Sequence, residues 1–369
     1  MPIRSSTAVT RGRQAKVRSA IRAANADALL VVNPADIRYL TGFVGDDSWL
    51  VLPMRGKPII LSDFRFEEQI EREAPDSVAV IRSGRMTDAL RGVLTKRKAI
   101  DTLAYQADHL TVAQSRSLSK PMRGVVKLKA LNEVTLAARQ VKTDDEVKLI
   151  RDALKIQQAA YLETIATIEP GQREAEVAAV LEYRMRALGA DDVSFPSIVA
   201  ADANAALPHA IPGSTKIKKN GIVLIDWGAR YRGYCSDLTR VVGVGGMSRK
   251  MREVYRVVLD AQLAAIDAIA PGVPLKEVDG VARKVIADAG YGDRFGHSLG
   301  HGLGLDVHEE PRLASSVKGV LEPGMVVTVE PGIYLPGVGG VRIEDDVLIT
   351  DRGHRVLSEL PKDLESAII

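Results

Sequence analysis

The chain has 369 residues and lacks several features that mark particular protein classes. It has a single cysteine, Cys235, which excludes a disulfide framework and any multi-cysteine zinc or iron–sulfur site. Its longest apolar runs, such as 28–32 and 177–181, fall far short of the roughly 18 residues that a membrane span needs. With 46% hydrophobic and 26% charged residues, the composition is that of a folded protein. We therefore expect a cytoplasmic location and no membrane partner.

Basic and acidic residues nearly balance but are unevenly distributed. Residues 1–140 carry 23 Lys/Arg against 14 Asp/Glu (+9), and residues 141–369 carry 27 against 33 (−6). The basic residues of the first part are scattered and not interleaved with aromatics, so no nucleic-acid partner is expected. The acidic second part is more informative, because metal sites with oxygen ligands need clustered carboxylates.

Hydrophobic periodicity places a domain boundary near residue 140. The first part, 1–140, alternates short apolar runs with helical patterns, which predicts an α/β domain. Its expected strands are 28–32, 48–52, 58–61, 78–81 and 98–100, and its expected helices 65–73 and 86–96. The second part, 141–369, pairs its strands and adds helices, which predicts an α+β domain. Its expected helices are 174–188, 248–269 and 275–289.

Two further segments have a helical pattern. A stretch over 132–166 predicts one long helix, with a capping box formed by Thr143 and Glu146. Residues 1–25 carry six basic residues and no acid, which is compatible with a transit peptide. A frayed tail followed by a helix over 14–24 is the favoured interpretation, because the segment runs directly into the strand pattern of 28–32.

Two hairpins with paired carboxylates are the most informative pattern. An apolar strand ends in Asp226, a polar turn follows, and the return strand carries Asp237. The midpoint falls between Tyr231 and Arg232, so a hairpin centred there would set the two aspartates opposite each other. A second hairpin would pair Glu330 with Glu344 around Gly337. Opposed carboxylates among apolar residues are destabilising unless a cation neutralises them.

Histidines are concentrated near these carboxylates. Three of the six, His297, His301 and His308, lie in a glycine-rich stretch whose backbone can approach a site closely. A fourth, His209, lies between prolines that favour a fixed loop. Four carboxylates and one imidazole suit manganese, cobalt, iron or zinc in a paired site, where two ions would activate a water for hydrolysis. Cys235 is expected to be a small packing residue.

The motifs resemble those of the pita-bread metallopeptidases, and within them the proline-specific branch of Xaa-Pro aminopeptidases and Xaa-Pro dipeptidases (prolidases). The resemblance covers nearly the whole chain; the segments that carry it are 33–43, 61–65, 225–240, 300–309, 328–334 and 341–345. It implies an amino-terminal creatinase-like α/β domain followed by a pita-bread α+β catalytic domain. The pseudo-twofold halves of that domain would make the two carboxylate hairpins face one another.

The resemblance also implies roles for individual residues. Two divalent ions, manganese in first place, would be held by five ligands: Asp226, Asp237, His301, Glu330 and Glu344. The catalytic residues would be His209, His308 and Glu330, with Glu330 as the general base. Contacts to substrate would come from His297, Tyr334 and Arg342. The implied substrates are proline-containing peptides, and the implied assembly is a homodimer.

Several functions are compatible with these motifs. Xaa-Pro aminopeptidase is the preferred interpretation, and Xaa-Pro dipeptidase is the alternative that the motifs do not separate from it. A metal-free hydrolase of the creatinase kind and a binding module on an inactive peptidase fold would both lack some of the ligands, whereas all five are present here. Methionine aminopeptidase is disfavoured by the extra amino-terminal domain and by the pattern from His297 to His308.

Overall fold

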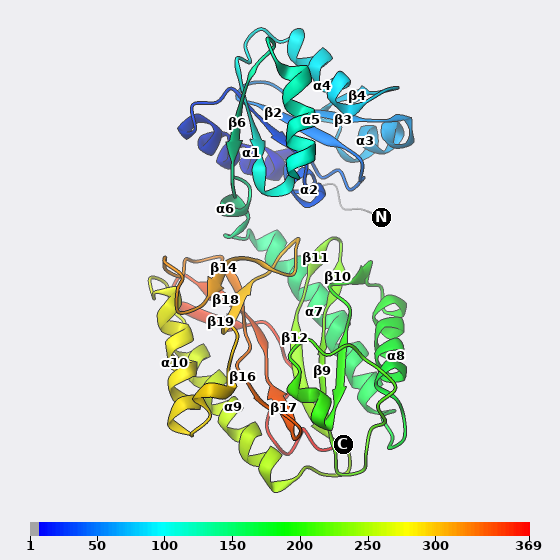
Figure 1. Ribbon diagram of the computed structural model, residues 1–369, viewed down its shortest axis with the longest axis vertical. Coiled ribbons are helices and arrows are strands. Elements are labelled where there is room, and N and C mark those ends of the chain that lie inside the picture. Colours follow the sequence, from blue (N-terminus) through cyan, green and yellow to red (C-terminus); the bar gives the residue numbers. More distant parts are fainter. Residues whose placement is uncertain (1–6) are drawn as a thin grey trace. The chain divides into compact units, whose positions relative to one another are not determined.

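The computed structural model describes residues 7–369 and divides into two compact units, one ending at Arg139 and the other spanning Gln140–Ile369 (Figure 1). The predicted frayed tail falls partly on residues 1–6, outside the described residues. The first helix, α1, spans Thr7–Ala23 and so begins earlier than predicted.

The amino-terminal unit is built on a mixed six-stranded sheet with the order β4-β3-β2-β1-β5-β6. Its strands are β1 (Ala28–Val31), β2 (Trp49–Pro53), β3 (Ile59–Ser62), β4 (Val78–Ile81), β5 (Thr102–Gln106) and β6 (Lys127–Leu131). The strand predicted at 98–100 is wrong. Those residues form turns, and the strand begins at Thr102, because 103–105 provide the residues that pair in parallel with β1.

Helices bury apolar residues against this sheet. They are α1, α2 (Pro34–Thr41), α3 (Glu67–Glu73), α4 (Met86–Thr95), α5 (Val112–Met122) and α6 (Leu136–Arg139). Leu90 and Leu94 of α4 and Leu118 of α5 share one buried cluster with Leu30 and Leu61 of the sheet. Helices α4 and α5 therefore cover one face, on which the strand residues alternate inward at every second position.

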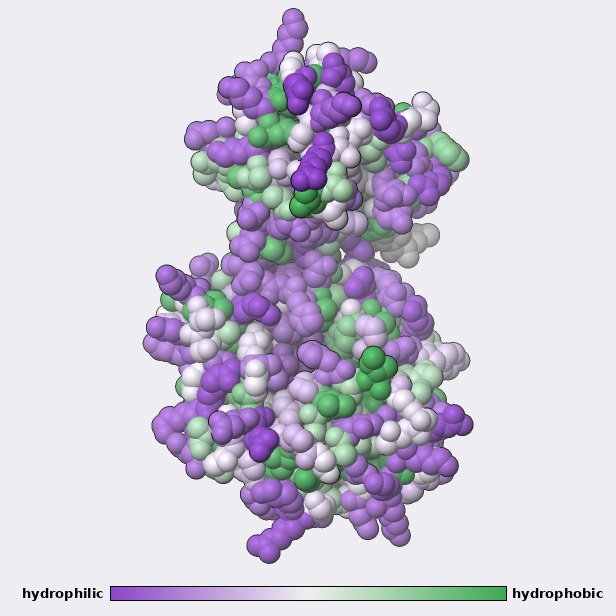
Figure 2. Space-filling view, in the orientation of Figure 1, coloured by the Kyte–Doolittle hydropathy of each residue, from purple (hydrophilic) through white to green (hydrophobic). Residues whose placement is uncertain are grey.

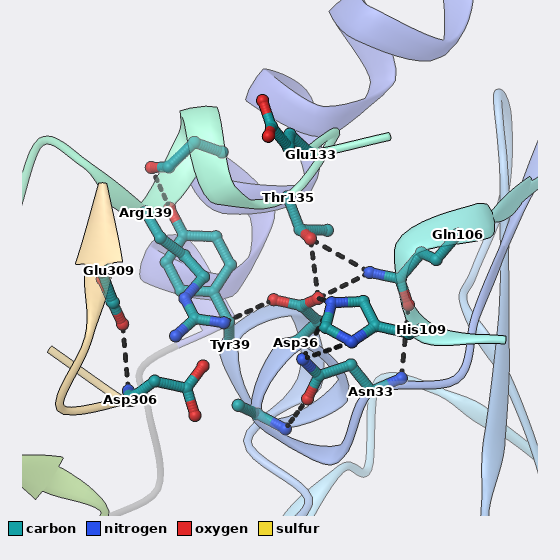
Figure 3. Close-up of polar contacts among 12 residues, drawn as sticks. Asn33, Asp36, Tyr39, Gln106, His109, Glu133, Thr135, Arg139, Asp306 and Glu309 are labelled. Atoms are coloured by element: carbon teal, nitrogen blue, oxygen red, sulfur yellow. Dashed lines mark hydrogen bonds and ion pairs between the residues drawn. The ribbon is translucent and has the colours of Figure 1, made fainter. Parts of the chain in front are cut away.

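A buried carboxylate ties the end of this unit together (Figure 3). Asp36 of α2 is fully buried and accepts hydrogen bonds from Gln106 Nε2 (2.5 Å), Thr135 Oγ1 (2.6 Å) and Arg139 Nη1 (2.8 Å). Arg139 is itself only 2% exposed. Since a buried charge is tolerated only when it is paired and hydrogen-bonded, this cluster fixes α6 against α2.

The carboxy-terminal unit, Gln140–Ile369, begins with an extended segment, so the continuous helix predicted over 132–166 is wrong. Helix α6 ends at Arg139, and α7 begins only at Asp144 and runs to Ile165. Between them Val141 forms a β-bridge to Met325, and Lys142 N donates to Gly324 O. The predicted capping box of Thr143 and Glu146 is confirmed, and it starts α7 after this break.

The remaining helices of this unit are α8 (Glu174–Ala187), α9 (Arg249–Asp267) and α10 (Leu275–Asp288). The principal strands are β8 (Ile198–Ala201), β9 (Ile222–Trp227), β12 (Leu238–Gly243), β13 (Gly300–Gly302), β14 (Glu309–Leu313), β15 (Val326–Val329), β16 (Gly332–Leu335), β17 (Gly339–Arg342), β18 (Asp345–Thr350) and β19 (Gly353–Val356). In Figure 1, β9, β12, β16 and β17 lie between α9 and α10 on one side and α8 on the other. One large apolar core joins α9 and α10 to these strands.

The strands form two antiparallel sheets that position the site, with the orders β12-β9-β8 and β14-β13-β15-β18-β19. A two-stranded ribbon, β16-β17, continues from β15 and β18. In Figure 2 hydrophilic residues cover most of the visible surface, broken by apolar patches. Among the described helices, none combines the length and the apolar character that a membrane crossing requires.

Candidate active site

The first carboxylate hairpin has a different register from the one predicted. Asp226 in β9 lies opposite Thr239 in β12, two residues beyond Asp237. The cause is the turn: Arg232 and Gly233 both have positive φ, 49° and 79°, as a two-residue type I′ turn requires. Because a shift of two residues leaves a side chain on the same face, Asp237 still faces the site, at the residue before β12.

The second hairpin has the predicted register. Val329 pairs with Asp345, and Gly332 pairs with Arg342, so Glu330 and Glu344 occupy opposed positions in the same register. The turn contains Gly337, which has φ +75°. The two hairpins lie side by side, because Glu344 N donates to Thr239 O and Thr239 Oγ1 donates to Glu344 Oε2 at 2.7 Å.

His301 lies in the strand β13. Its spacing of four residues from His297 would also fit a helix, but this segment does not form one. Gly300 allows the close approach of this strand to β15, since a Cβ at that position would lie 1.9 Å from Thr328 O. His301 N then contacts Thr328 Oγ1, and Glu330 N donates to Leu299 O at 2.8 Å. These contacts bring the imidazole beside Glu330.

The side chains converge in a buried cluster. His301 Nε2 lies 3.3 Å from Glu330 Oε1 and 3.8 Å from Asp237 Oδ2. One possible ligand atom each from Asp237, His301 and Glu344 lie within 4.8 Å of one another. Asp226 belongs to the same cluster, because its charge and those of Glu330 and Glu344 all act on Asp237.

Burial and mutual repulsion dominate the electrostatics. Burial, then the charge of Glu344, raises the pKa of Asp237 well above its usual range, and burial with Glu330 does the same for the pKa of Glu344. Burial also raises the pKa of Asp226 despite Arg342. For Glu330, burial is outweighed by the hydrogen bond and charge of His301, so its pKa is lowered. Without a cation this cluster therefore carries a large electrostatic penalty.

The donor set fits a divalent cation. Asp226 Oδ1 and Asp237 Oδ1 are buried and have no hydrogen-bond partner. His301 Nδ1 lies 3.0 Å from Gly302 O and can donate to it, while Nε2 faces Glu330 and Asp237 and can give up its proton to bind a metal. Buried, unpartnered carboxylate oxygens next to an imidazole nitrogen are the ligands that first-row divalent metals take.

A hydrogen-bonded chain runs from this cluster to His297. Arg342 is 3% exposed; its Nη2 donates to Asp226 Oδ2 at 2.5 Å, and its Nη1 to the hydroxyl of Tyr334 at 2.8 Å. That hydroxyl lies 2.8 Å from His297 Nε2. Burial lowers the pKa of His297. The three predicted substrate-contacting residues thus belong to one network with Asp226.

The other two predicted histidines flank the cluster. The rings of His308 and His301 meet edge to face with centroids 4.4 Å apart. Burial, followed by the charge of His301, lowers the pKa of His308, and the charge of His209 acts in the same direction. His209 is on the loop after η3 (Asp202–Ala206), next to Pro208, whose carbonyl lies 3.4 Å from Arg342 Nη1.

Three polar residues of the site were missed by the sequence reasoning. Thr239 holds Glu344 and accepts from Arg342 Nε at 3.0 Å. Thr328 Oγ1 lies 3.3 Å from Glu330 Oε1, and Asp346 Oδ2 accepts from Asp237 N at 3.3 Å. Each lies two residues from a predicted ligand, so the two-residue period of a strand is the signal that could have identified them.

A buried carboxylate–histidine cluster held between two antiparallel hairpins has the donor set of a metal site. Two family models match the chain: Metallopeptidase family M24 over residues 148–351, and the Creatinase/Prolidase N-terminal domain over residues 13–141. The chain belongs to metallopeptidase family M24, and the predicted family and fold are confirmed.

Individual relatives agree with this assignment. An uncharacterized peptidase of Bacillus subtilis, YqhT, is 38% identical over 349 residues, covering 95% of this chain and 98% of the relative. A solved Xaa-Pro dipeptidase from Bacillus anthracis has a TM-score of 0.93 and 37% identity, covering 98% of this chain and all of that one (100%). The X-Pro aminopeptidase from Thermotoga maritima has a TM-score of 0.88 and 36% identity, covering 95% and 100%.

Proposed function

We propose that this protein is an Xaa-Pro dipeptidase that hydrolyses the bond between an N-terminal residue and a carboxyl-terminal proline. The observation that carries the proposal is the match over 98% of the chain to a solved Xaa-Pro dipeptidase. An Xaa-Pro dipeptidase of Pyrococcus furiosus, 44% identical over 245 residues (66% of this chain and 70% of the relative), supports it. The sequence reasoning put aminopeptidase first, and these relatives favour its alternative.

Xaa-Pro aminopeptidase stays the second candidate, because the similar Thermotoga structure bears that name. The two activities differ in the group attached after proline, which is a free carboxylate in a dipeptide and a further peptide bond in a longer substrate. The residues of the buried cluster do not separate the two activities, so the cluster is compatible with both.

In this proposal Asp226, Asp237, His301, Glu330 and Glu344 hold two divalent ions, with manganese as the first candidate and cobalt, zinc or iron as the others. When bound, such ions lower the pKa of a water and polarise the scissile carbonyl. Burial, and after it the repulsion of neighbouring carboxylates, raises the pKa values of Asp237 and Glu344 well above their usual range, and cations held by these residues would offset that repulsion.

The remaining residues act on protons and on the substrate. Glu330 is proposed to accept the proton of the attacking water as the general base. His209 and His308 are proposed to donate hydrogen bonds to the developing oxyanion. His297 and Tyr334 are proposed to line the pocket for proline, while Arg342, fully engaged by Asp226, Thr239 and Tyr334, holds this wall in place. The expected homodimer and cytoplasmic location stay predictions.

The test is cleavage of Ala-Pro and Ala-Pro-Ala by metal-stripped protein reloaded with manganese, with cobalt and zinc in parallel. The dipeptidase proposal expects Ala-Pro to be cut at least about tenfold faster in kcat/KM, a difference of about 1.4 kcal/mol in transition-state stabilisation. Asp237→Asn, which keeps the shape but loses the charge, should abolish cleavage. Preference for Ala-Pro-Ala establishes the aminopeptidase instead, and no cleavage of either with any of the three metals refutes both.

A further inference from the structure

The segment that carries His209 has little regular structure of its own. It leaves β8 at Ala201, passes through η3 and a turn, and ends at Gly213 next to the start of α8. Within it, a turn is closed by Ala210 N donating to Leu207 O at 3.1 Å. Large apolar side chains on it face solvent, since Leu207 is 58% and Ile211 88% exposed. These two large side chains therefore do not hold the loop in place; within the segment the small residues Ala205 and Ala210 are the ones that belong to the buried core.

A single buried carboxylate joins the two ends of this segment. Glu174, the first residue of α8, is 1% exposed. Its Oε1 accepts from Ala201 N at 2.7 Å and from Asn204 Nδ2 at 3.0 Å, and its Oε2 accepts from Gly213 N at 3.1 Å. Charge-assisted hydrogen bonds of this kind are about twice as strong as neutral ones. The side chain of Glu174 thus links Ala201 to Gly213, beside a second link from Asn204 Nδ2 to Thr215 Oγ1 at 2.9 Å.

The carboxylate is held on a rigid support. Helix α8 buries Val177, Leu181 and Met185 and contacts both α7 and β8. The first backbone N–H groups of α8 also donate to the segment's far end, Glu174 N to Thr215 O and Ala175 N to Gly213 O, both at 3.1 Å. The side chain of Glu174 adds a hydrogen bond to Ala201 N, at the other end of the segment.

From this geometry we infer that Glu174 is a positioning residue for His209. It closes the loop 201–213 and so fixes the imidazole relative to the buried cluster. The inference rests on the proposed function, in which His209 contacts the oxyanion. It deepens that function by assigning a role in the reaction to a residue that reaches neither metal nor substrate.

Glu174→Gln weakens the hydrogen bonding between α8 and the loop with little change in side-chain shape. An amide offers one oxygen and one N–H₂ group, whereas all three partners are donors. In either orientation of the amide, the N–H₂ group faces at least one donor, so at least one of the side-chain hydrogen bonds between Glu174 and the loop is lost. Glu176→Gln is the matched control. Glu176 lies on the same turn of α8, is about 50% exposed, and its Oε2 accepts from Arg173 N, which an amide oxygen can also do.

The experiment compares kcat and KM of the manganese-loaded enzyme, its metal content and amide hydrogen exchange of peptides covering 201–213. For Glu174→Gln we expect kcat to fall about tenfold, within the ~100-fold that a 1 Å misplacement can cost. Metal content should not change, and exchange in 201–213 should rise. In a His209→Ala background the same substitution should change kcat less than about twofold. If Glu174 acts only through His209, its substitution has nothing further to remove once His209 is gone. A general loss of stability would instead lower kcat by the same factor in both backgrounds. Glu176→Gln should match the wild type in all measurements.

The outcomes for the role of Glu174 and for the proposed function are distinguishable. If the wild type cleaves Xaa-Pro substrates but Glu174→Gln keeps its kcat, or loses equally in both backgrounds, the positioning role is refuted while the function stands. If the wild type cleaves none, the function is refuted and with it the role in catalysis. Increased exchange in Glu174→Gln would then still establish the closure of the loop, and unchanged exchange would overturn that as well.

Discussion

Thr239 offers the sharpest test of how the two hairpins support each other. Its hydroxyl donates to Glu344 Oε2 at 2.7 Å and accepts from Arg342 Nε at 3.0 Å, and the residue is fully buried. Thr239→Val keeps the volume and the β-branched shape but removes both contacts. It leaves the guanidinium N–H without this acceptor and one carboxylate oxygen without its donor, both in a buried position.

The magnitude follows from the charges involved. Hydrogen bonds to charged groups contribute about 1.5–3 kcal/mol each, and two that share one hydroxyl are not additive, so we expect a loss of about 2–4 kcal/mol. For a unit of this size that lowers the unfolding midpoint by roughly 10 °C. Removing a partner that orients a metal ligand typically costs about 10–100-fold in metal affinity, so manganese should bind that much more weakly.

The assays are thermal unfolding of the metal-free protein and calorimetric titration with manganese. Thr239→Ser is the control, because it keeps the hydroxyl and should retain most of the metal affinity. The reasoning is refuted if Thr239→Val binds manganese as tightly as the wild type. It is refuted equally if the serine variant is impaired as strongly as the valine variant, since the methyl group would then be the cause.

Two further predictions concern buried carboxylates. In the metal-free protein, Asp237 and Glu344 have raised pKa values, so the folded state binds more protons than the unfolded one; its stability should increase as pH falls through those raised values toward the ordinary 3.8 and 4.5. Thermal unfolding between about pH 8 and pH 5, with Asp237→Asn showing a smaller gain, checks this, and a stability that only declines would contradict it. In the amino-terminal unit, Asp36→Asn should cost about 3–5 kcal/mol, because the buried Arg139 loses its carboxylate. Chemical denaturation measures the loss, and a change below about 1 kcal/mol, the size of an exposed ion pair, would show that this pair does not hold α6.

The two hairpins differ in how far their register can be predicted from the sequence. In both, an apolar run that ends in a carboxylate identified the first strand, and the midpoint of the turn predicted which carboxylates lie opposite each other. The register of the second hairpin followed correctly from the midpoint at Gly337. In the first, the midpoint rule failed by two residues, because the positive φ of Arg232 and Gly233 decides where the chain reverses.

Helix boundaries show the same limit. The periodicity of 132–166 is helical throughout, yet the chain is extended at Val141 and Lys142 because these residues pair with Met325 and Gly324, far away in the sequence. Only the capping box at Thr143, a local signal, marked the true start of α7. The strand expected at 98–100 was displaced for a similar reason, since pairing with β1 selects the residues of β5.

The sequence alone was sufficient for the kind of chemistry. The sequence itself gives the types and the order of the carboxylates and histidines. Local apolar runs that end in carboxylates indicate the strands that carry them. Only the tertiary structure decided which oxygens meet His301, which threonines hold Glu344 and Glu330, and that Glu174 closes the loop bearing His209. Apart from the contact between Thr328 and Glu330, which are two residues apart, those contacts join distant segments, as between Thr328 and His301 (27 residues apart) or Thr239 and Glu344 (105 residues apart), and no local propensity encodes such pairings. They arise when buried polar groups, brought together by the packing of two sheets, must find partners.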